Sequence, residues 1–169
     1  MNIFQKMSSN FPLHTTNQLF NHVIFASLGG FIAIAIISFL AEYTGYPLLM
    51  GSLGASCVLL FGFPESPFSQ PKNVVLGHLI STFIGLTFLH LVGPQWWSLA
   101  LALSASIGLM IATNTVHPPA GSNPVIVFLA HANWSFIVMP SFIGSVSLVI
   151  VALIFINSSQ KRHYPKSWR

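Results

Sequence analysis

Hydrophobic positions along the chain are gathered into runs of unequal length, separated by short polar stretches. Four runs are long enough to cross a bilayer as helices: 19–42, 74–92, 99–115 and 136–156. At ~1.5 Å per residue, the first run covers ~36 Å, compared with a hydrocarbon core of ~30 Å. The pattern therefore predicts four full transmembrane helices.

Two further apolar runs are too short to span and are led by helix breakers. In Pro47–Phe63, about ten residues after Gly51 lack a breaker, which allows ~15 Å of helix. In the second run, Pro118, Pro119 and Pro124 precede the apolar residues up to Ala130. We predict two broken or half helices, with turns at Gly51-Ser52 and Gly121-Ser122-Asn123.

The order of these runs repeats. A long span, a short Gly-Ser-led run and a long span occur in 19–93 and again in 96–157. If the short runs cross the membrane, each half has three crossings and the halves are inverted, as in many secondary transporters. If they are re-entrant, the halves are parallel. Lys72 lies on the cytoplasmic side in the inverted arrangement and on the opposite side in the re-entrant one. Because basic residues are enriched on the cytoplasmic side, this favours the inverted arrangement. The predicted fold class is an all-α polytopic membrane protein with a two-fold internal repeat.

Composition supports an integral membrane protein with the lipid bilayer as its surroundings. Hydrophobic residues make up 53% of the chain and charged residues 5%, against about 25% charged in soluble domains. Residues 1–18 form an N-terminal arm without the pattern of a cleavable signal, 19–157 a single transmembrane domain, and 158–169 a basic cytoplasmic tail. The tail contains four of the six bases. By the positive-inside rule we expect both termini in the cytoplasm. We expect the protein in the inner (plasma) membrane of the cell. This tail is not a nucleic-acid surface, for which a basic stripe with aromatic residues is needed.

The two breaks predict an internal binding site. Irregular backbone is tolerated within a bilayer where protein buries it or water lines it, because an unsatisfied amide costs several kcal/mol in hydrocarbon. Two helix N-termini that meet near the midplane would offer free N–H groups to a small anion. The substrate-binding candidates are glycines that allow close approach and neutral donors beside the breaks: Gly51, Ser52, Gly54, Ser56, Thr115, His117, Gly121, Ser122 and Asn123. No Arg or Lys lies in the predicted spans.

Two histidines are candidates for proton coupling. His117 lies just before the second break, and His78 lies about one turn into its helix. An imidazole titrates near neutral pH, so it suits a hydrogen bond to an anion or a proton transfer coupled to transport. The alternative is that His117 satisfies carbonyls freed by Pro118 and Pro119, and that His78 has a capping role. A single cysteine, Cys57, excludes a Cys-based metal site, and we expect no metal and no other cofactor.

Two other classes of function stay open at this point. One is a membrane-embedded enzyme with His117 as base and Ser52, Ser122 or Cys57 as nucleophile, although both carboxylates, Glu42 and Glu65, lie near predicted helix ends. The other is a structural subunit of a larger complex. We expect a transporter and not an enzyme. We also expect a homo-oligomer, and take a dimer as the working guess, because a lone protomer of this size buries its polar breaks poorly.

Several motifs resemble the HPP family of integral membrane proteins. They are Pro47-x3-Gly51-Ser52-x-Gly54-Ala55-Ser56, Phe61-Gly62-x-Pro64-Glu65-Ser66-Pro67, Gln70-Pro71-Lys72-Asn73-Val74-x2-Gly77-His78 and Thr115-Val116-His117-Pro118-Pro119-Ala120-Gly121. The resemblance runs from about His22 to Trp168. It implies four transmembrane helices and, by association with plastid and cyanobacterial members, transport of nitrite. Some bacterial members carry an additional C-terminal regulatory domain, and we expect this sequence to be a bare transporter module without one.

Overall fold

Helices make up all the regular secondary structure of the part of the chain described by the computed structural model, residues 16–159 and 162–168. In chain order they are α2 (Thr16–Thr44), α3 (Gly51–Cys57), the π-helical η1 (Val58–Gly62), the 3-10 helix η2 (Pro67–Ser69), α4 (Pro71–Thr87), the π-helical η3 (Phe88–Val92), α5 (Trp96–Ala112), the 3-10 helix η4 (Pro118–Ser122), α6 (Asn123–Leu129), the 3-10 helix η5 (Trp134–Ile137), the π-helical η6 (Val138–Phe142) and α7 (Ile143–Asn157). The predicted all-α class is confirmed. The predicted N-terminal arm, 1–18, falls mostly outside the described residues.

Within the described residues, three helices are long and apolar enough to cross a membrane: 17–44, 71–92 and 134–157. They correspond to the first, second and fourth predicted spans. The third predicted span, 99–115, is the 17-residue helix α5, which ends at Ala112 and leaves Thr113–His117 outside the helix. At ~25 Å, α5 is shorter than a typical spanning helix. The four-span count therefore stays a prediction.

Two short apolar helices follow breaks in the chain, and their starts differ slightly from those predicted. Residues 47–50 have no regular secondary structure, Met50 is extended, and the first short helix begins at Gly51 itself and continues without interruption to Gly62. The second begins earlier than expected, because Pro118–Ser122 already forms a 3-10 helix and α6 continues from Asn123. Gly121 and Ser122 therefore lie within helix and not in a turn that precedes it. Proline at the first 3-10 position explains this early start, because its φ is preset for a helix.

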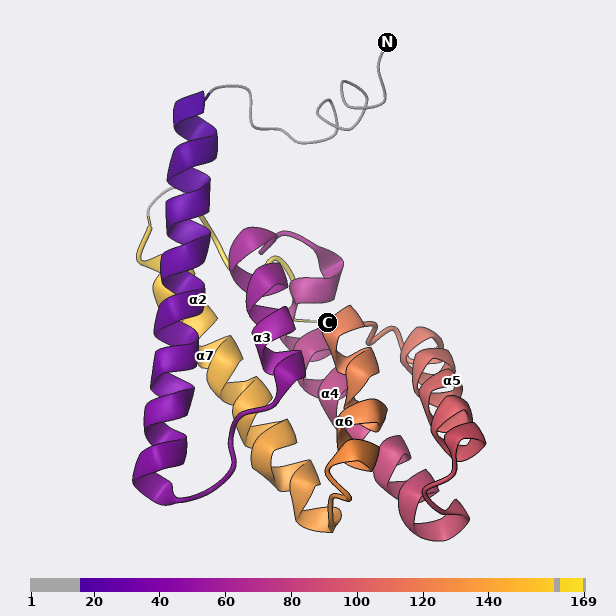
Figure 1. The fold of residues 1–169 in the computed structure, drawn as a ribbon. Helices are drawn as coiled ribbons and strands as arrows, with labels where there is room; N and C mark the ends of the chain where they lie inside the picture. Colours follow the sequence, from indigo (N-terminus) through magenta and orange to yellow (C-terminus); the bar gives the residue numbers. More distant parts are fainter. Residues whose placement is uncertain (1–15, 160–161, 169) are drawn as a thin grey trace.

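Consecutive apolar helices run in alternating directions (Figure 1). In this view α2 descends, the segment from α3 to η1 ascends, α4 descends, α5 ascends, α6 descends and α7 ascends. The start of α2 and the end of α7 lie at the same end of the bundle. The first and last long helices therefore begin and end on one side of the bundle, as both predicted arrangements require.

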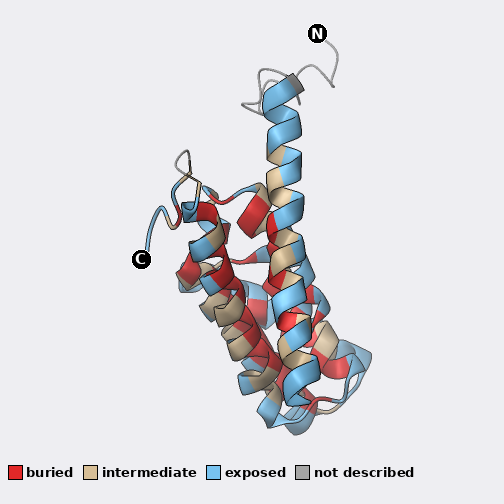
Figure 2. Cartoon of the chain, turned by 90° about the vertical axis from the view of Figure 1, so that its left-hand side faces the viewer, coloured by how far each residue is buried: buried red, intermediate tan, exposed pale blue. Residues whose placement is uncertain are grey.

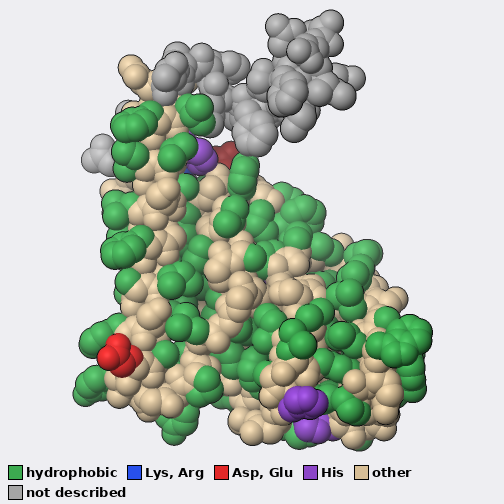
Figure 3. Space-filling model, viewed as in Figure 1, with side chains coloured by type: hydrophobic (Ala, Val, Ile, Leu, Met, Phe, Trp, Pro, Cys, Tyr) green, Lys and Arg blue, Asp and Glu red, His purple; other side chains and the backbone are tan. Residues whose placement is uncertain are grey.

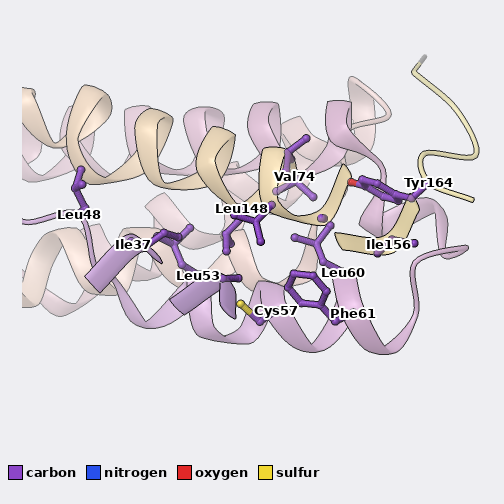
Figure 4. Packing of buried hydrophobic residues seen from close by; sticks show 14 of the residues in the cluster. Ile37, Leu48, Leu53, Cys57, Leu60, Phe61, Val74, Leu148, Ile156 and Tyr164 are labelled. Carbon is purple, nitrogen blue, oxygen red and sulfur yellow. The ribbon is translucent and has the colours of Figure 1, made fainter. Parts of the chain in front are cut away.

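The main hydrophobic core lies between α2, α3, η1 and α7 (Figure 4). Ile37, Leu53, Leu60, Phe61 and Leu148 are fully buried there. Outside this core α2 is exposed along most of its length (Figure 2), and hydrophobic side chains cover its surface (Figure 3). An apolar helix surface of this kind is suited to contact with lipid.

The C-terminal segment folds back onto the loop between η1 and α4. The fully buried Tyr164 donates its hydroxyl to the Ser69 carbonyl at 2.8 Å, and Gln70 Oε1 accepts the backbone N–H groups of Lys166 and Ser167 at 2.9 and 3.1 Å. Lys166 Nζ also lies 3.0 Å from Glu65 Oε1. Burial raises the pKa of the Tyr164 phenol, so the hydroxyl stays protonated and able to donate. The basic tail predicted for 158–169 is thus partly a packed element.

Replacing Tyr164 by phenylalanine should loosen this segment. The change removes the donor to the Ser69 carbonyl and leaves that buried carbonyl without this partner, so we expect a loss of about 1–3 kcal/mol in unfolding free energy. The measurement is heating in detergent with a fluorogenic maleimide, because the single cysteine, Cys57, is buried and reacts on unfolding. Tyr43→Phe, at a side chain 80% exposed, is the control. Equal melting of both variants would contradict the assigned role of the Tyr164 hydroxyl.

Candidate functional site

One serine hydroxyl lies between two histidine rings in the interior of the bundle. Ser56 Oγ is 2.7 Å from His117 Nε2 and 3.0 Å from His78 Nε2. The two imidazole rings are 5.1 Å apart, centre to centre, and nearly edge to face. All three side chains are fully buried. We call Ser56, His78 and His117 the His-Ser-His cluster.

Each member of the cluster comes from a different part of the chain. Ser56 lies in the second turn of α3, and His78 lies in the second turn of α4, which starts at Pro71. His117 has extended backbone, with φ −134° and ψ 100°, directly before the 3-10 helix η4. Extended backbone is expected there, because a following proline disfavours the helical conformation of the residue before it. The His117-Pro118-Pro119 sequence therefore sets the backbone that carries the imidazole into the bundle.

Two glycines of α4 allow the second break to approach this helix. A Cβ at Gly77 would lie 2.8 Å from His117 Cβ and 3.1 Å from the Thr115 carbonyl oxygen, and a Cβ at Gly85 would lie 2.9 Å from Pro124 Cα. Such distances are below normal van der Waals contact, so neither position has room for a larger residue. In membrane helices, small residues let backbones pack closely in this way.

A second set of polar side chains extends from His78. Asn123 Nδ2 lies 3.0 Å from His78 Nδ1 and donates to the His78 carbonyl at 3.2 Å and to Thr82 Oγ1 at 2.9 Å. Thr82 donates to Ser141 Oγ at 2.9 Å, and Ser141 donates back to the His78 carbonyl at 3.1 Å. The network therefore joins α4, α6 and the η6 segment around His78.

Two polar atoms beside the cluster have no partner among the described residues: Ser52 Oγ and Asn123 Oδ1. Ser52 is four residues before Ser56 on α3, which places both on one face of the helix. Both residues are buried, with Ser52 1% and Asn123 0% exposed. An unpartnered buried hydroxyl or amide oxygen costs about 1–3 kcal/mol. These atoms are the natural partners for a small polar ligand or water.

The interior around the cluster is neutral. The buried polar side chains of the described residues are Ser, Thr, Asn, Gln and His, and none is Asp, Glu, Lys or Arg. No third His, Cys, Asp or Glu of that part of the chain joins the two histidines to make a metal-binding group. The chemistry available is hydrogen bonding and proton transfer by imidazole.

An open pocket of about 420 Å³ lies on the outer side of His117. His117 Nδ1 donates to the Phe68 carbonyl at 2.7 Å, and Phe68 and Val116 both line the pocket. Asn73, another lining residue, donates to the Val116 carbonyl at 2.9 Å. The remaining lining includes Glu65, Gln70, Asn114, Lys166 and Ser167. We call this space the outer pocket; Phe68 both lines it and contacts His117 of the cluster.

The structure brings together part of the predicted site. Ser56, His78, His117 and Asn123 are linked by hydrogen bonds, and Ser52 lies beside them. The other candidates lie apart from this cluster. Thr115 is buried but pairs with Thr113 Oγ1 at 2.7 Å, and Ser122 is exposed and donates to the Pro119 carbonyl at 2.8 Å. Gly51 and Gly54 are exposed and Gly121 is half-buried, with no neighbouring atom within 4 Å of a Cβ placed on any of them.

Sequence reasoning missed Thr82, Ser141, Phe68 and Gly77. Thr82 lies four residues after His78 on α4, so helical periodicity would have placed it on the same face. No pattern in the sequence indicates that the Phe68 carbonyl faces His117, because that contact joins residues 49 positions apart through tertiary packing.

Comparison with known proteins gives the family of this chain. The family model for the HPP transmembrane region matches residues 15–165. A transmembrane protein of Dictyostelium discoideum is 34% identical over 152 residues, which cover 85% of this chain and 53% of the relative. A second transmembrane protein of the same organism is 38% identical over 128 residues, covering 71% of this chain and 41% of the relative.

The chain thus spans about half the length, or less, of these curated relatives. No solved structure matches it. The family match extends over α2 to α7 and includes all four motifs on which the resemblance rested, so that expectation is confirmed. This multi-pass helical membrane protein belongs to the HPP transmembrane family.

Proposed function

We propose that this protein carries a small monovalent anion across the membrane and that the anion binds beside the His-Ser-His cluster. The supporting observation is the buried, uncharged polar network of Ser52, Ser56, His78, His117 and Asn123 in a bundle of membrane-spanning helices. Ionisable and polar groups within membranes are costly and usually mark a substrate or proton pathway. Nitrite, implied by the family resemblance, is the first substrate to test.

The atoms left free favour an anion over a metal cation. A cation site needs carboxylates or several carbonyl oxygens, and the described interior holds no carboxylate. The unpartnered Ser52 hydroxyl supplies a neutral donor, and protonated imidazole supplies a charged one. The free oxygen of Asn123 accepts a hydrogen bond from a water or from the acid form of the substrate.

The outer pocket supports a route to this site. Lys166 and Ser167 of the C-terminal segment line it, and so does Phe68, whose carbonyl accepts from His117. Polar side chains line it, including Asn73, Asn114 and Lys166. In this proposal an anion is concentrated in the outer pocket and reaches the cluster when Phe68 or Val116 moves.

The alternating helix directions support an inverted repeat of α2–α4 and α5–α7. Each half then has three crossings in opposite senses, and each contributes one short helix to the centre, where α3 contacts η4. In inverted repeats, transport proceeds by motion of one half against the other around a central site. The spanning role of α3, α5 and α6 belongs to this proposal, as does nitrite as the substrate.

Uptake of nitrite by proteoliposomes tests the proposal, and two adjacent residues give a matched pair of variants. Asn123→Ala removes a side chain of the buried polar network, and we expect uptake to fall about 2- to 12-fold. This range corresponds to ~0.5–1.5 kcal/mol, the contribution of one neutral hydrogen bond. Ser122→Ala changes an exposed side chain that bonds within its own turn, and we expect uptake to be unchanged. Absence of nitrite uptake by the wild type, with formate and nitrate also excluded, would sink the proposal.

The Ser56–His117 distance of 2.7 Å also favours a second candidate, a membrane-embedded hydrolase with Ser56 as nucleophile. The Phe68 carbonyl would orient the imidazole, as the third group of a triad does. Ser56 is fully buried and does not line the outer pocket, so a substrate would have to enter the bundle to reach it. A fluorophosphonate probe separates the two functions: covalent labelling of Ser56 in the wild type, lost in His117→Gln, would support the hydrolase.

A further inference from the structure

The hydroxyl of Ser56 has one hydrogen but three possible partners. It lies 2.9 Å from the Ser52 carbonyl, 2.7 Å from His117 Nε2 and 3.0 Å from His78 Nε2. A hydroxyl donates one hydrogen bond and accepts up to two. The direction of its hydrogen is therefore set by which ring nitrogens carry protons.

The neighbours of the two imidazole rings determine which tautomer each neutral histidine adopts. A carbonyl only accepts, so the 2.7 Å contact with the Phe68 carbonyl places a proton on His117 Nδ1. In neutral His117, Nε2 then has a lone pair and accepts from Ser56. Asn123 Nδ2 lies 3.0 Å from His78 Nδ1, and an amide nitrogen cannot accept a hydrogen bond, so a proton on Nδ1 would face an N–H group. The proton of neutral His78 is therefore on Nε2 and is donated to Ser56.

The orientation of Asn123 is itself fixed by its surroundings. Its Nδ2 lies 3.2 Å from the His78 carbonyl, which only accepts, and 2.9 Å from Thr82, whose own proton is donated to Ser141. If the amide nitrogen and oxygen of Asn123 exchanged places, Oδ1 would face the carbonyl oxygen of His78. The Asn123 amide therefore holds a donor against His78.

A proton added to His117 is accommodated without loss of a hydrogen bond. Protonated Nε2 donates to Ser56 Oγ at the same 2.7 Å, and the Ser56 hydrogen turns to the Ser52 carbonyl at 2.9 Å. A proton added to His78 Nδ1 would instead oppose the N–H of Asn123 at 3.0 Å. The geometry thus distinguishes two histidines that are chemically alike.

Charged groups lie outside this centre. His78 on α4 is the titratable neighbour that faces His117, and α3 and η2 contribute no charged side chain. Lys72 is six residues before His78, ~9 Å along α4. Glu65 and Lys166 line the outer pocket beyond Phe68 and pair with each other.

We infer that His117 takes up one proton with each anion, and that rotation of the Ser56 hydroxyl makes this possible. The inference rests on the proposed function. The proton arrives from water or from the acid form of the substrate, binds at His117 Nε2 and leaves with the anion on the other side. Protonated His117 and a monovalent anion together carry no net charge. Ser56 is thus a positioning residue for the proton, and not primarily a ligand of the anion.

The first test reads the proton directly, in purified wild-type protein labelled with ¹⁵N-histidine. At neutral pH we expect His117 to be the Nδ1–H tautomer, and acidification with nitrite to convert it to imidazolium while His78 stays neutral. An Nε2–H tautomer for neutral His117, or protonation of His78 before His117, would overturn the inference. This readout does not depend on transport.

The second test measures uptake with and without an inward proton gradient, together with internal pH from a trapped dye. In the wild type we expect the gradient to stimulate nitrite uptake and protons to enter with nitrite. Ser56→Ala should reduce the stimulation ratio to about one, and Ser56→Thr, which keeps a hydroxyl, should restore it. The matched control is Ser106→Ala, because Ser106 is a buried helix serine whose hydroxyl lies 2.8 Å from the carbonyl four residues earlier, as the Ser56 hydroxyl lies 2.9 Å from the Ser52 carbonyl, but has no histidine as a hydrogen-bond partner.

The outcomes separate the inference from the proposed function. Uptake without proton entry, or Ser56→Ala stimulated like the wild type, overturns the inference and leaves anion transport standing. Absence of uptake by the wild type overturns the proposed function and co-transport together, and the ¹⁵N titration still decides whether His117 is the proton acceptor.

Discussion

Nitrite uptake should fall about 10- to 150-fold when His117 is replaced by glutamine. The range corresponds to ~1.5–3 kcal/mol, the cost of losing a hydrogen bond to a charged group. The His117 ring donates to the Phe68 carbonyl through one nitrogen, and accepts from Ser56 or takes up a proton at the other. Glutamine keeps a polar group of similar size but has no nitrogen that takes up a proton. Initial rates in proteoliposomes with equal protein content measure the effect.

A second histidine provides the matched control for this prediction. His90 also contacts a backbone carbonyl, that of Ala132 at 3.0 Å, but it is exposed at the far end of α4 and η3. His90→Gln should transport at the wild-type rate. Maleimide labelling of Cys57 on heating shows whether each variant is folded. A folded His117→Gln protein with wild-type uptake would remove His117 from the transport site.

Gly85→Val should destabilise the protein and disturb the site from a distance. A Cβ at Gly85 would lie 2.9 Å from Pro124 Cα, and backbone cannot move aside as a flexible side chain does. Overpacking of this kind costs about 1–3 kcal/mol, or roughly 2–12 °C in melting midpoint for a chain of this size. Displacement of Pro124 also moves the adjacent Asn123 away from His78, so uptake should fall even in the folded fraction.

Gly108→Val on α5 controls for the poor helix propensity of valine. A Cβ there has no neighbour within 4 Å and the residue is exposed. Its melting midpoint should stay close to that of the wild type, because valine and glycine both have low helix propensity. If the two variants melt alike, close packing of α4 against α6 does not limit stability.

The helical class and the two breaks were predictable because they depend on local chemistry. Long apolar runs require helices in a bilayer, and Pro118 and Gly51 mark chain breaks whatever surrounds them. His117 was predictable as a site residue because an ionisable group at a break in a membrane protein is rarely incidental. These inferences need no knowledge of which helices are neighbours.

The central contact of the site was not predictable from such rules. Ser56 was one of several hydroxyls near the breaks, and its position between two rings depends on how α3 is rotated relative to α4 and η4. Ser122 shows the converse. Its place beside Asn123 suggested a shared role, but successive residues of a helix face different directions, and its hydroxyl turns outward to Pro119.

The absence of fixed charge from the described interior has a consequence for energetics across a polarised membrane. Moving one elementary charge across 100 mV costs or yields about 2.3 kcal/mol. An anion that entered a negative-inside cell alone would work against that potential. A neutral empty carrier, and a loaded carrier in which imidazolium balances the anion, would cross without electrical work. Uptake should therefore be the same at any membrane voltage and should follow the chemical gradients of the anion and the proton.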